Sequence, residues 1–426
     1  MNSLIRLIYT FVLAIIAPFY LLSLFKKKEG KPCVGSRWTE HFGFTPPLSA
    51  HKDQEIIWIH AVSVGETISV IPFIKQLNID FPEKRIIITT TTPTGAEQAQ
   101  KISGIAEHRY MPLDFPFAIR GFIRSIRPSH LIIMETELWP NLLYIAKNNH
   151  IKISIINARL SEKSYHNYLK VKPLINFCLY HIDQIYCQHR EDSDRFHLLG
   201  AQTSQLSVTG SLKYDIEISE EIKKQSADLR NKIGARRPVW IAASTHIGED
   251  ELILENHKQI LEEFPDALLI LVPRHPERFN SVYELCVKEG LTTQRRTQED
   301  THGQPYQVYL GDTMGEMLIL IGAADICVMG GSFIGKTVGG HNVLEPASLG
   351  IPTITGPSYY NFRDITLTLQ QSGAVIILTH ANEISSSVLS LLTNPERMRT
   401  MSSQARNLVI ENSGALTKTI NMLFHP

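Results

Sequence analysis

Two carboxylates and a tryptophan follow one short apolar segment. Leu131–Met134 is apolar throughout, and Glu135, Glu137 and Trp139 come directly after it. Acidic side chains at the end of a buried strand are costly to desolvate without a partner, so they predict a charged partner or a chemical role. In the alternative interpretation, one carboxylate caps the next helix and the other is solvated. We favour the functional interpretation.

Glu66 is a second candidate, because it follows the apolar segment Ile56–Ala61 and Gly65 at the predicted start of a helix. A carboxylate in this position can accept a proton from an attacking hydroxyl group, as general base catalysis requires. The position equally suits a carboxylate that only stabilises the helix N-terminus through the helix dipole. Lys213 carries the charge to neutralise an anionic ligand, although a surface lysine would look the same.

Three stretches in the second half have the composition of an anion-binding site. They are Pro273-Arg274, Met314-Gly315-Glu316 and Asn342-Val343-Leu344-Glu345. Arginine binds phosphate in a bidentate manner, and backbone N–H groups at a helix start attract anions. Glu345, about one turn into the predicted helix, is placed to accept hydrogen bonds from a ribose diol. Gly330–Ser332, after the apolar run Ile326–Met329, has the composition of a strand that ends in an open turn. An ordinary strand-to-helix turn followed by a surface glutamate is the alternative.

The sequence also excludes several kinds of chemistry. It contains no GxGxxG, GxSxG or HExxH motif, which disfavours dinucleotide redox chemistry and two classes of hydrolase. No Asp-x-Asp motif follows a strand, so we expect no metal site, and a donor with a single phosphate suits that expectation. Lysine plus arginine and aspartate plus glutamate number 42 each, so no net charge attracts nucleic acid. The five cysteines show no CxxC spacing, which suits a reducing compartment.

These candidates depend on an alternation of apolar strands and helices. A chain of 426 residues is too long for one core, which favours two domains. Apolar strands that alternate with helices predict parallel sheets covered on both faces. The strands predicted in the first half are 56–61, 85–91, 131–134, 152–157 and 184–187. Those predicted in the second half are 239–243, 267–272, 307–310, 326–329, 352–355 and 374–377.

The N-terminal segment Leu4–Phe25 is nearly all apolar and has about the length of one bilayer crossing. Lys26-Lys27-Lys28 follows at once, so the positive-inside rule places the rest of the chain in the cytoplasm. We therefore expect a membrane anchor over residues 1–28, with a helix that lies in the interface as the rival to a full span. A cleaved signal peptide fits poorly, because the basic cluster follows the apolar run.

The remaining boundaries follow from composition. Residues 29–210 form the expected acceptor-binding domain and 211–237, which are polar and charged, the linker. Residues 238–426 form the expected donor-binding domain, whose closing helix, roughly 395–424, is placed to cross back onto the first domain.

Taken together, these motifs resemble those of bacterial 3-deoxy-D-manno-oct-2-ulosonic acid (Kdo) transferases, nearly from end to end. The matching blocks include His60–Glu66, Thr92–Gly95, Met134–Asn141, Asn157–Ser161, Gly210–Lys213, Pro273–Arg278, Gly311–Glu316 and Gly339–Asn342. One departure is the loop Phe333–Val338, which is longer than the family pattern leads us to expect. This difference in length affects only the expected conformation of the donor-binding loop.

The resemblance implies a GT-B fold, in which two doubly wound Rossmann-like domains face a central cleft. It also implies transfer of Kdo from CMP-Kdo to the lipid A precursor, lipid IVA, by a single inverting displacement at the cytoplasmic face of the inner membrane. By position, Glu66 matches the family's proton acceptor, and Glu135 and Lys213 match residues that stabilise the transition state. The CMP-binding positions match Pro273, Arg274, Met314, Gly315, Glu316 and Asn342, Val343, Leu344, Glu345. CMP-Kdo is then a substrate and no cofactor is expected, while lipid A precursor and membrane headgroups are the partners.

Two other readings remain open at this point. One is another GT-B enzyme, such as a nucleotide-sugar epimerase, and the apolar N-terminal segment opposes it because a soluble substrate needs no anchor. The other is a non-catalytic protein that binds a nucleotide sugar or a lipid, which has no need of Glu66.

Overall fold

The computed structural model describes residues 2–25, 35–48, 54–298, 305–335 and 337–425. The chain divides into two compact units. Unit 1 comprises Met1–Asp215 together with Ser413–Pro426, and unit 2 comprises Ile216–Asn412. The basic run Lys26–Lys28 lies outside the described residues.

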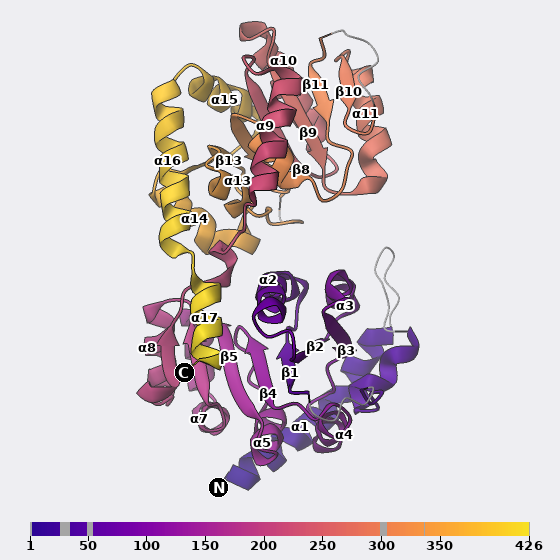
Figure 1. Cartoon of the computed structure of the whole chain (residues 1–426), viewed down its shortest axis with the longest axis vertical. Helices are drawn as coiled ribbons and strands as arrows, with labels where there is room; N and C mark the ends of the chain where they lie inside the picture. Colours follow the sequence, from indigo (N-terminus) through magenta and orange to yellow (C-terminus); the bar gives the residue numbers. More distant parts are fainter. Residues whose placement is uncertain (1, 26–34, 49–53, 299–304, 336, 426) are drawn as a thin grey trace. The chain divides into compact units, whose positions relative to one another are not determined.

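Unit 1 is built on a seven-stranded sheet in the order β3-β2-β1-β4-β5-β6-β7, with every neighbouring pair parallel (Figure 1). Its strands are β1 (Ile56–His60), β2 (Arg85–Thr90), β3 (Ala106–Tyr110), β4 (His130–Met134), β5 (Lys152–Ala158), β6 (Gln184–Cys187) and β7 (Leu206–Val208). Its helices are α1 (Asn2–Phe25), α2 (Val64–Asp80), α3 (Pro93–Ala99), α4 (Pro116–Ile126), α5 (Pro140–Asn148), α6 (Glu162–Leu169), α7 (Lys172–Tyr180), α8 (Arg190–Leu198) and α17 (Ala415–Phe424). Short 3-10 helices are η1 (Gly35–Phe42), η2 (Gln100–Ile102), η3 (Thr203–Gln205) and η4 (Leu212–Tyr214).

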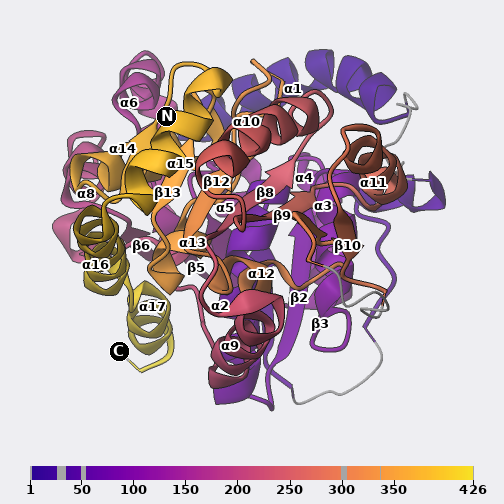
Figure 2. The same cartoon turned by 90° about the horizontal axis from the view of Figure 1, so that it is seen from above.

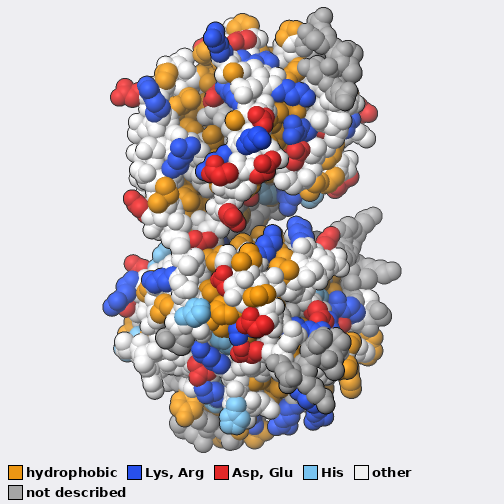
Figure 3. Space-filling model, viewed as in Figure 1, with side chains coloured by type: hydrophobic (Ala, Val, Ile, Leu, Met, Phe, Trp, Pro, Cys, Tyr) orange, Lys and Arg blue, Asp and Glu red, His pale blue; other side chains and the backbone are white. Residues whose placement is uncertain are grey.

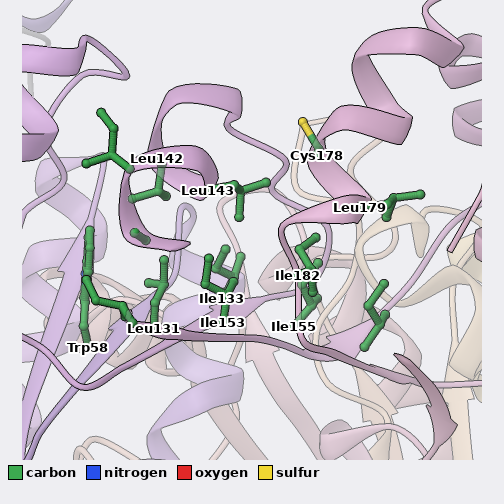
Figure 4. Packing of buried hydrophobic residues seen from close by; sticks show 14 of the residues in the cluster. Trp58, Leu131, Ile133, Leu142, Leu143, Ile153, Ile155, Cys178, Leu179 and Ile182 are labelled. Atoms are coloured by element: carbon green, nitrogen blue, oxygen red, sulfur yellow. The ribbon is translucent and has the colours of Figure 1, made fainter. Parts of the chain in front are cut away.

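Alternate residues of these strands pack against two layers of helices. Trp58 and Ile133 point to one face and lie in a cluster with side chains of α4, α5, α7 and α8 (Figure 4). Ile59 and Ile132 point to the other face and pack with side chains of α2, α3 and α17. The near-continuous apolar runs of β1 and β4 are therefore explained by burial on both faces of a parallel sheet.

Unit 2 repeats this design, with a parallel sheet in the order β10-β11-β9-β8-β12-β13-β14. Its strands are β8 (Val239–Thr245), β9 (Leu268–Pro273), β10 (Thr293–Arg295), β11 (Val308–Leu310), β12 (Ile326–Met329), β13 (Thr353–Thr355) and β14 (Val375–Ile377). Its helices are α9 (Glu220–Gly234), α10 (Asp250–Glu263), α11 (Phe279–Lys288), α12 (Met317–Gly322), α13 (Leu344–Leu349), α14 (Arg363–Gln371), α15 (Ile384–Leu392) and α16 (Pro395–Asn412). Its short 3-10 helices are η5 (Pro276–Arg278), η6 (Tyr360–Phe362) and η7 (Ala381–Glu383).

Every strand that the sequence predicted is present, and three further strands, β3, β7 and β10, were not predicted. All three lie at an edge of their sheet. The sequences of β3 (AEHRY) and β10 (TQR) are mostly polar, and β7 has only three residues. Edge strands need no continuous apolar run, so apolar patterning misses them.

The segment expected to be a linker, residues 211–237, is largely structured. η4 belongs to unit 1, and α9 belongs to unit 2, where it packs against α12 (Figure 2). The expected closing helix is two helices, α16 and α17, with a break at Gly414, whose φ of 90° suits glycine. α16 belongs to unit 2 and α17 to unit 1.

One face of α1 packs on unit 1 and the other is exposed. The Arg6 guanidinium lies 3.7 Å from the centre of the Tyr144 ring, and the Asn141 side-chain amide donates a hydrogen bond to the Thr10 hydroxyl at 2.9 Å. The exposed face carries Leu4, Leu7, Ile8, Phe11, Val12, Ile15 and Ile16, each 47–69% exposed. Within the described ranges, no helix combines the length and apolar character of a membrane span.

Charged side chains of both signs are interspersed on the visible face of each unit (Figure 3). This mixture agrees with the equal numbers of basic and acidic residues in the sequence.

Candidate active site

The sheet of unit 1 brings the predicted catalytic residues toward one edge. β1 and β4 are neighbours, and the strand order changes direction between them, which is where ligands bind in open parallel sheets. Glu66 lies in the first turn of α2, which follows β1, and Glu135 directly follows β4. Lys213 lies in η4 and its Nζ is 3.6 Å from Glu135 Oε1. The structure therefore pairs two of the three residues directly.

Glu66 is held in place by its own helix start. Its Oε2 accepts a hydrogen bond from the Val62 backbone N–H, and its Oε1 accepts one from the Ser63 hydroxyl, both at 2.8 Å. Ser63 Oγ in turn accepts from the Glu66 backbone N–H at 3.2 Å, as in a capping box. The carboxyl group is thus fixed at the strand end, and the residue is only 9% exposed.

The electrostatic surroundings of Glu66 favour its protonated form. Burial raises the pKa of Glu66 to about 7, and the negative charges of Glu135 and Glu137 add to this rise against the opposing hydrogen bonds from Val62 and Ser63. Burial also raises the pKa of Glu137, whose Oε2 accepts a hydrogen bond from the Trp139 indole N–H at 2.9 Å. A carboxyl group with a pKa near neutrality can both accept and hold a proton at physiological pH.

Three non-glycine residues at strand ends have a strained backbone conformation. Among the described residues, Glu135 (φ 59°), Asn157 (φ 52°) and Ser244 (φ 62°) have left-handed backbone directly after β4, at the end of β5 and within the end of β8. Such conformations cost about 1–2 kcal/mol in a non-glycine residue. The Oδ1 atom of buried Asn157 accepts the Leu212 backbone N–H at 3.1 Å, which positions the turn that carries Lys213.

In unit 2, the predicted donor-binding residues separate into two groups. Arg274 follows β9, and its backbone N–H donates to the Thr245 carbonyl at 2.9 Å. Asn342 Oδ1 accepts the Leu344 backbone N–H at 3.1 Å, but the N-cap of α13 is Val343, one residue later than the sequence predicts. Burial raises the pKa of Glu345, and Asn342 and the Arg274 charge oppose the rise. Arg274 and Glu345 therefore share one electrostatic environment.

Pro273, next to Arg274, ends β9 and pairs with β8. The second group is the turn before α12, in which Met314 is 62% exposed and Gly315 has a φ of 86°. The Glu316 carboxylate is held by Arg296, at 2.7 Å from Nη2 and 3.1 Å from Nε. This bidentate hydrogen bonding lowers the pKa of Glu316 and keeps it ionised.

The turn Gly330–Ser332, which the sequence predicts to be open, is filled by a side chain. The Glu249 carboxylate accepts hydrogen bonds from the backbone N–H groups of Gly331, Ser332 and Phe333 at 2.7–3.1 Å, and Glu249 is 1% exposed. The open turn was therefore a wrong expectation, because an internal carboxylate occupies its amides. A Cβ at Gly330 would lie 2.7 Å from the Ser244 carbonyl oxygen, which explains the first glycine.

Two histidines that the sequence did not single out complete this region. His246, after β8, and His341, before α13, have stacked rings whose Nε2 atoms lie 2.8 Å apart. The His246 backbone N–H also donates to Glu249 at 2.9 Å. The two histidines are 95 residues apart in the chain, so no local sequence signal could have paired them. The described residues contain no group of three or more His, Cys, Asp or Glu arranged to hold a metal ion.

Two units, each with a doubly wound parallel sheet, are the architecture of the GT-B fold class. A family model described as 3-deoxy-D-manno-octulosonic-acid transferase (kdotransferase) matches residues 36–216. The 3-deoxy-D-manno-octulosonic acid transferase of Haemophilus influenzae is 38% identical, over 98% of each chain. The enzyme of the same name from Bordetella pertussis is 31% identical, again over 98% of each chain. The chain therefore belongs to the Kdo transferase family.

The fold has a wider distribution than the family. The crystal structure of UDP-GlcNAc 2-epimerase from Neisseria meningitidis bound to UDP-GlcNAc has a TM-score of 0.58 with 14% sequence identity. It covers 88% of this chain and 100% of that one. This likeness concerns the architecture of the two units alone.

Proposed function

We propose that this chain transfers Kdo from CMP-Kdo to the lipid A precursor, lipid IVA, by a single inverting displacement that needs no metal. In this reaction a lipid hydroxyl attacks the anomeric carbon of Kdo, the bond from that carbon to the phosphate oxygen breaks, and CMP leaves. The hydroxyl proton passes to Glu66. Family membership supports the overall reaction, and the residue roles rest on the geometry of each unit.

The assignment of Glu66 as the base rests on the fixed position of its carboxyl group and on its raised pKa. Its carboxyl group is fixed by Val62 and Ser63, and its pKa is raised by burial to about 7. A base with this pKa is largely ionised slightly above neutral pH, yet holds the proton strongly enough to promote attack. Glu135, with Lys213 at 3.6 Å, supplies negative charge for the positive charge that develops on the sugar.

For the donor, we propose that unit 2 binds CMP through the residues that follow its strands. Arg274 provides a cation for the phosphate, and Asn342 and Glu345 provide polar groups for the ribose. Pro273 and the turn of Met314 and Gly315 complete the proposed contacts. Glu316 acts in the same turn through its ion pair with Arg296.

The test is incubation of the purified full-length protein with CMP-Kdo and lipid IVA, followed by mass spectrometry of the lipid. We expect product that is heavier by one or more Kdo units. A Glu66→Gln variant should bind CMP as the wild type does but form product about 10²–10⁴-fold more slowly. Normal turnover by that variant would refute the base assignment, and hydrolysis of CMP-Kdo without lipid product would refute the transfer.

We also propose that α1 attaches the protein to the cytoplasmic face of the inner membrane by lying in the bilayer interface. Its exposed apolar face recurs at every third or fourth position, which makes a continuous stripe along the helix. The opposite face is held on unit 1 through Arg6 and Thr10. This placement brings the lipid substrate and the enzyme to the same surface.

Co-sedimentation with vesicles of phosphatidylethanolamine and phosphatidylglycerol tests this attachment. Replacing Leu7 and Phe11 by Glu should weaken vesicle binding about tenfold or more, because each buried side chain of this size contributes roughly 1.5–3 kcal/mol. Ile79→Glu is the matched control, because Ile79 in α2 is 69% exposed and lies outside the stripe. Equal loss of binding in the control, or none in the α1 variant, would contradict the proposal.

A further inference from the structure

The histidine pair of unit 2 has a geometry that ordinary surface histidines lack. The rings of His246 and His341 are 9° from parallel with centroids 5.1 Å apart, and the Nε2 atoms are 2.8 Å apart. A Cβ at Gly331 would lie 2.8 Å from His341 Cδ2, so the second glycine of the turn leaves the space in which the His341 ring lies. The pair is thus built into the strand-to-helix turn.

The short Nε2–Nε2 distance restricts where the protons are. One Nε2 must donate to the other, so a neutral pair consists of one Nε2–H ring and one Nδ1–H ring. It then presents one Nδ1–H donor and one Nδ1 lone pair outside the shared bond. Addition of a single proton makes both Nδ1 atoms donors and gives the pair a positive charge. One proton therefore leaves an N–H donor at each end of the pair and gives the pair a positive charge, which suits an anion beside either Nδ1.

Two arginines and a third histidine act electrostatically on the pair. Arg274 and His275, after β9, and Arg278, in η5, are the charged or titratable groups that act on its rings. Burial is the main cause that lowers the pKa of His246 to about 4 and that of His341 to about 3, and these groups add to it.

Two carboxylates adjoin the region but are already engaged. Glu249 is bound by backbone N–H groups, including that of His246, and Asp250 is paired with Arg278. Glu345 shares the field of Arg274 and keeps its proton more readily than an exposed glutamate. The site is therefore short of negative charge, and an anionic ligand would supply it.

We infer that His246 and His341 form part of the donor site, where they bind the phosphate ester of the nucleotide and take up one proton from solvent as it binds. The inference rests on the proposed function, because it requires that unit 2 binds CMP. The inference adds two residues that bind the negatively charged phosphate of the donor. It also makes the affinity for the donor depend on pH. The bound phosphate offsets Arg274 and accepts a hydrogen bond from one Nδ1–H group, while the added charge is shared across the Nε2–Nε2 hydrogen bond.

Isothermal titration calorimetry of the full-length protein with CMP tests this inference. Titrations at pH 5.5 in buffers with different ionisation enthalpies report the number of protons taken up. A nearby opposite charge raises a pKa by about 1–3 units, and a rise of about two units predicts uptake of about 0.7 proton by the pair. The same rise predicts that CMP affinity increases about fourfold more in the wild type than in a variant without the pair between pH 8 and pH 5.5.

The variants are His246→Gln and His341→Gln, with His380→Gln as the matched control. His380 precedes η7 in unit 2, where its backbone N–H donates to Glu383 at 3.1 Å, and it takes no part in the shared hydrogen bond. We expect the control to take up as many protons as the wild type, and the two pair variants to take up about 0.7 fewer. Any proton that CMP itself gains is common to all four proteins and cancels in these differences.

Equal proton uptake by the wild type and the pair variants would overturn the inference and leave the donor site intact. Failure of the wild type to bind CMP would overturn the donor site and the inference together. If the variants do not fold, the wild type alone decides, because a CMP affinity that does not rise between pH 8 and pH 5.5 contradicts the coupling.

Discussion

Lowering the pH should switch off this enzyme through Glu66. The proposed mechanism requires the ionised carboxylate, and burial raises the pKa of Glu66 from the ordinary value of 4.5 to about 7. A group with this raised pKa is protonated, and hence inactive as a base, below neutral pH. We therefore expect kcat/KM to fall as the pH decreases through 7, and to reach a plateau above it.

The size of the effect follows from the titration. With a pKa of about 7, roughly 9% of the carboxyl groups are ionised at pH 6 and roughly 91% at pH 8, so kcat/KM should differ about tenfold. With the ordinary pKa of 4.5, the carboxylate would be almost fully ionised at both values and no difference would appear. The loss of a general base lowers a rate by about 10²–10⁴-fold, which sets the expectation for Glu66→Gln.

The assay is the initial rate of Kdo transfer to lipid IVA between pH 5.5 and pH 9, at CMP-Kdo concentrations far below KM. Glu66→Gln should show no inflection near pH 7 in its residual rate. A flat profile for the wild type between pH 6 and pH 8, or a variant within threefold of the wild type, would refute the assignment of the base.

Three further outcomes follow from the same geometry. Lys213→Met should lower kcat and move the inflection to higher pH, because the Glu135 charge is then no longer offset and raises the pKa of Glu66 further; an unmoved inflection in the pH profile would contradict this. Glu249→Leu should lower the free energy of unfolding by about 3–5 kcal/mol in urea titrations, because several backbone N–H groups lose a charged acceptor; a change below about 1 kcal/mol would argue against this role. Gly330→Ala should destabilise the protein by about 2 kcal/mol, measured by thermal unfolding, because its Cβ would overlap a backbone carbonyl oxygen; an unchanged Tm would show that the turn can move.

Apolar patterning was sufficient to locate the central strands of both sheets and the residues at their ends. Ile56–His60 and His130–Met134 are buried on two faces, so their sequences are apolar without interruption. Parallel strands place their carboxyl ends on one edge of a sheet, so Glu66 and Glu135, each predicted to follow a strand, lie toward that edge; that the two strands are neighbours came from the structure. Edge strands such as Ala106–Tyr110 carry polar residues and escaped this pattern.

The sequence by itself determined the family, the two-sheet architecture and the carboxylates of the candidate site, because these depend on local composition and on the order of strands and helices. Only the tertiary structure decided how those groups behave. It showed that Glu249 fills the glycine turn, that Arg296 holds Glu316 and that His246 meets His341. Each of these depends on contacts between residues distant in the chain, and the desolvation that lowers the pKa values of His246 and His341 arises only when the surrounding elements pack.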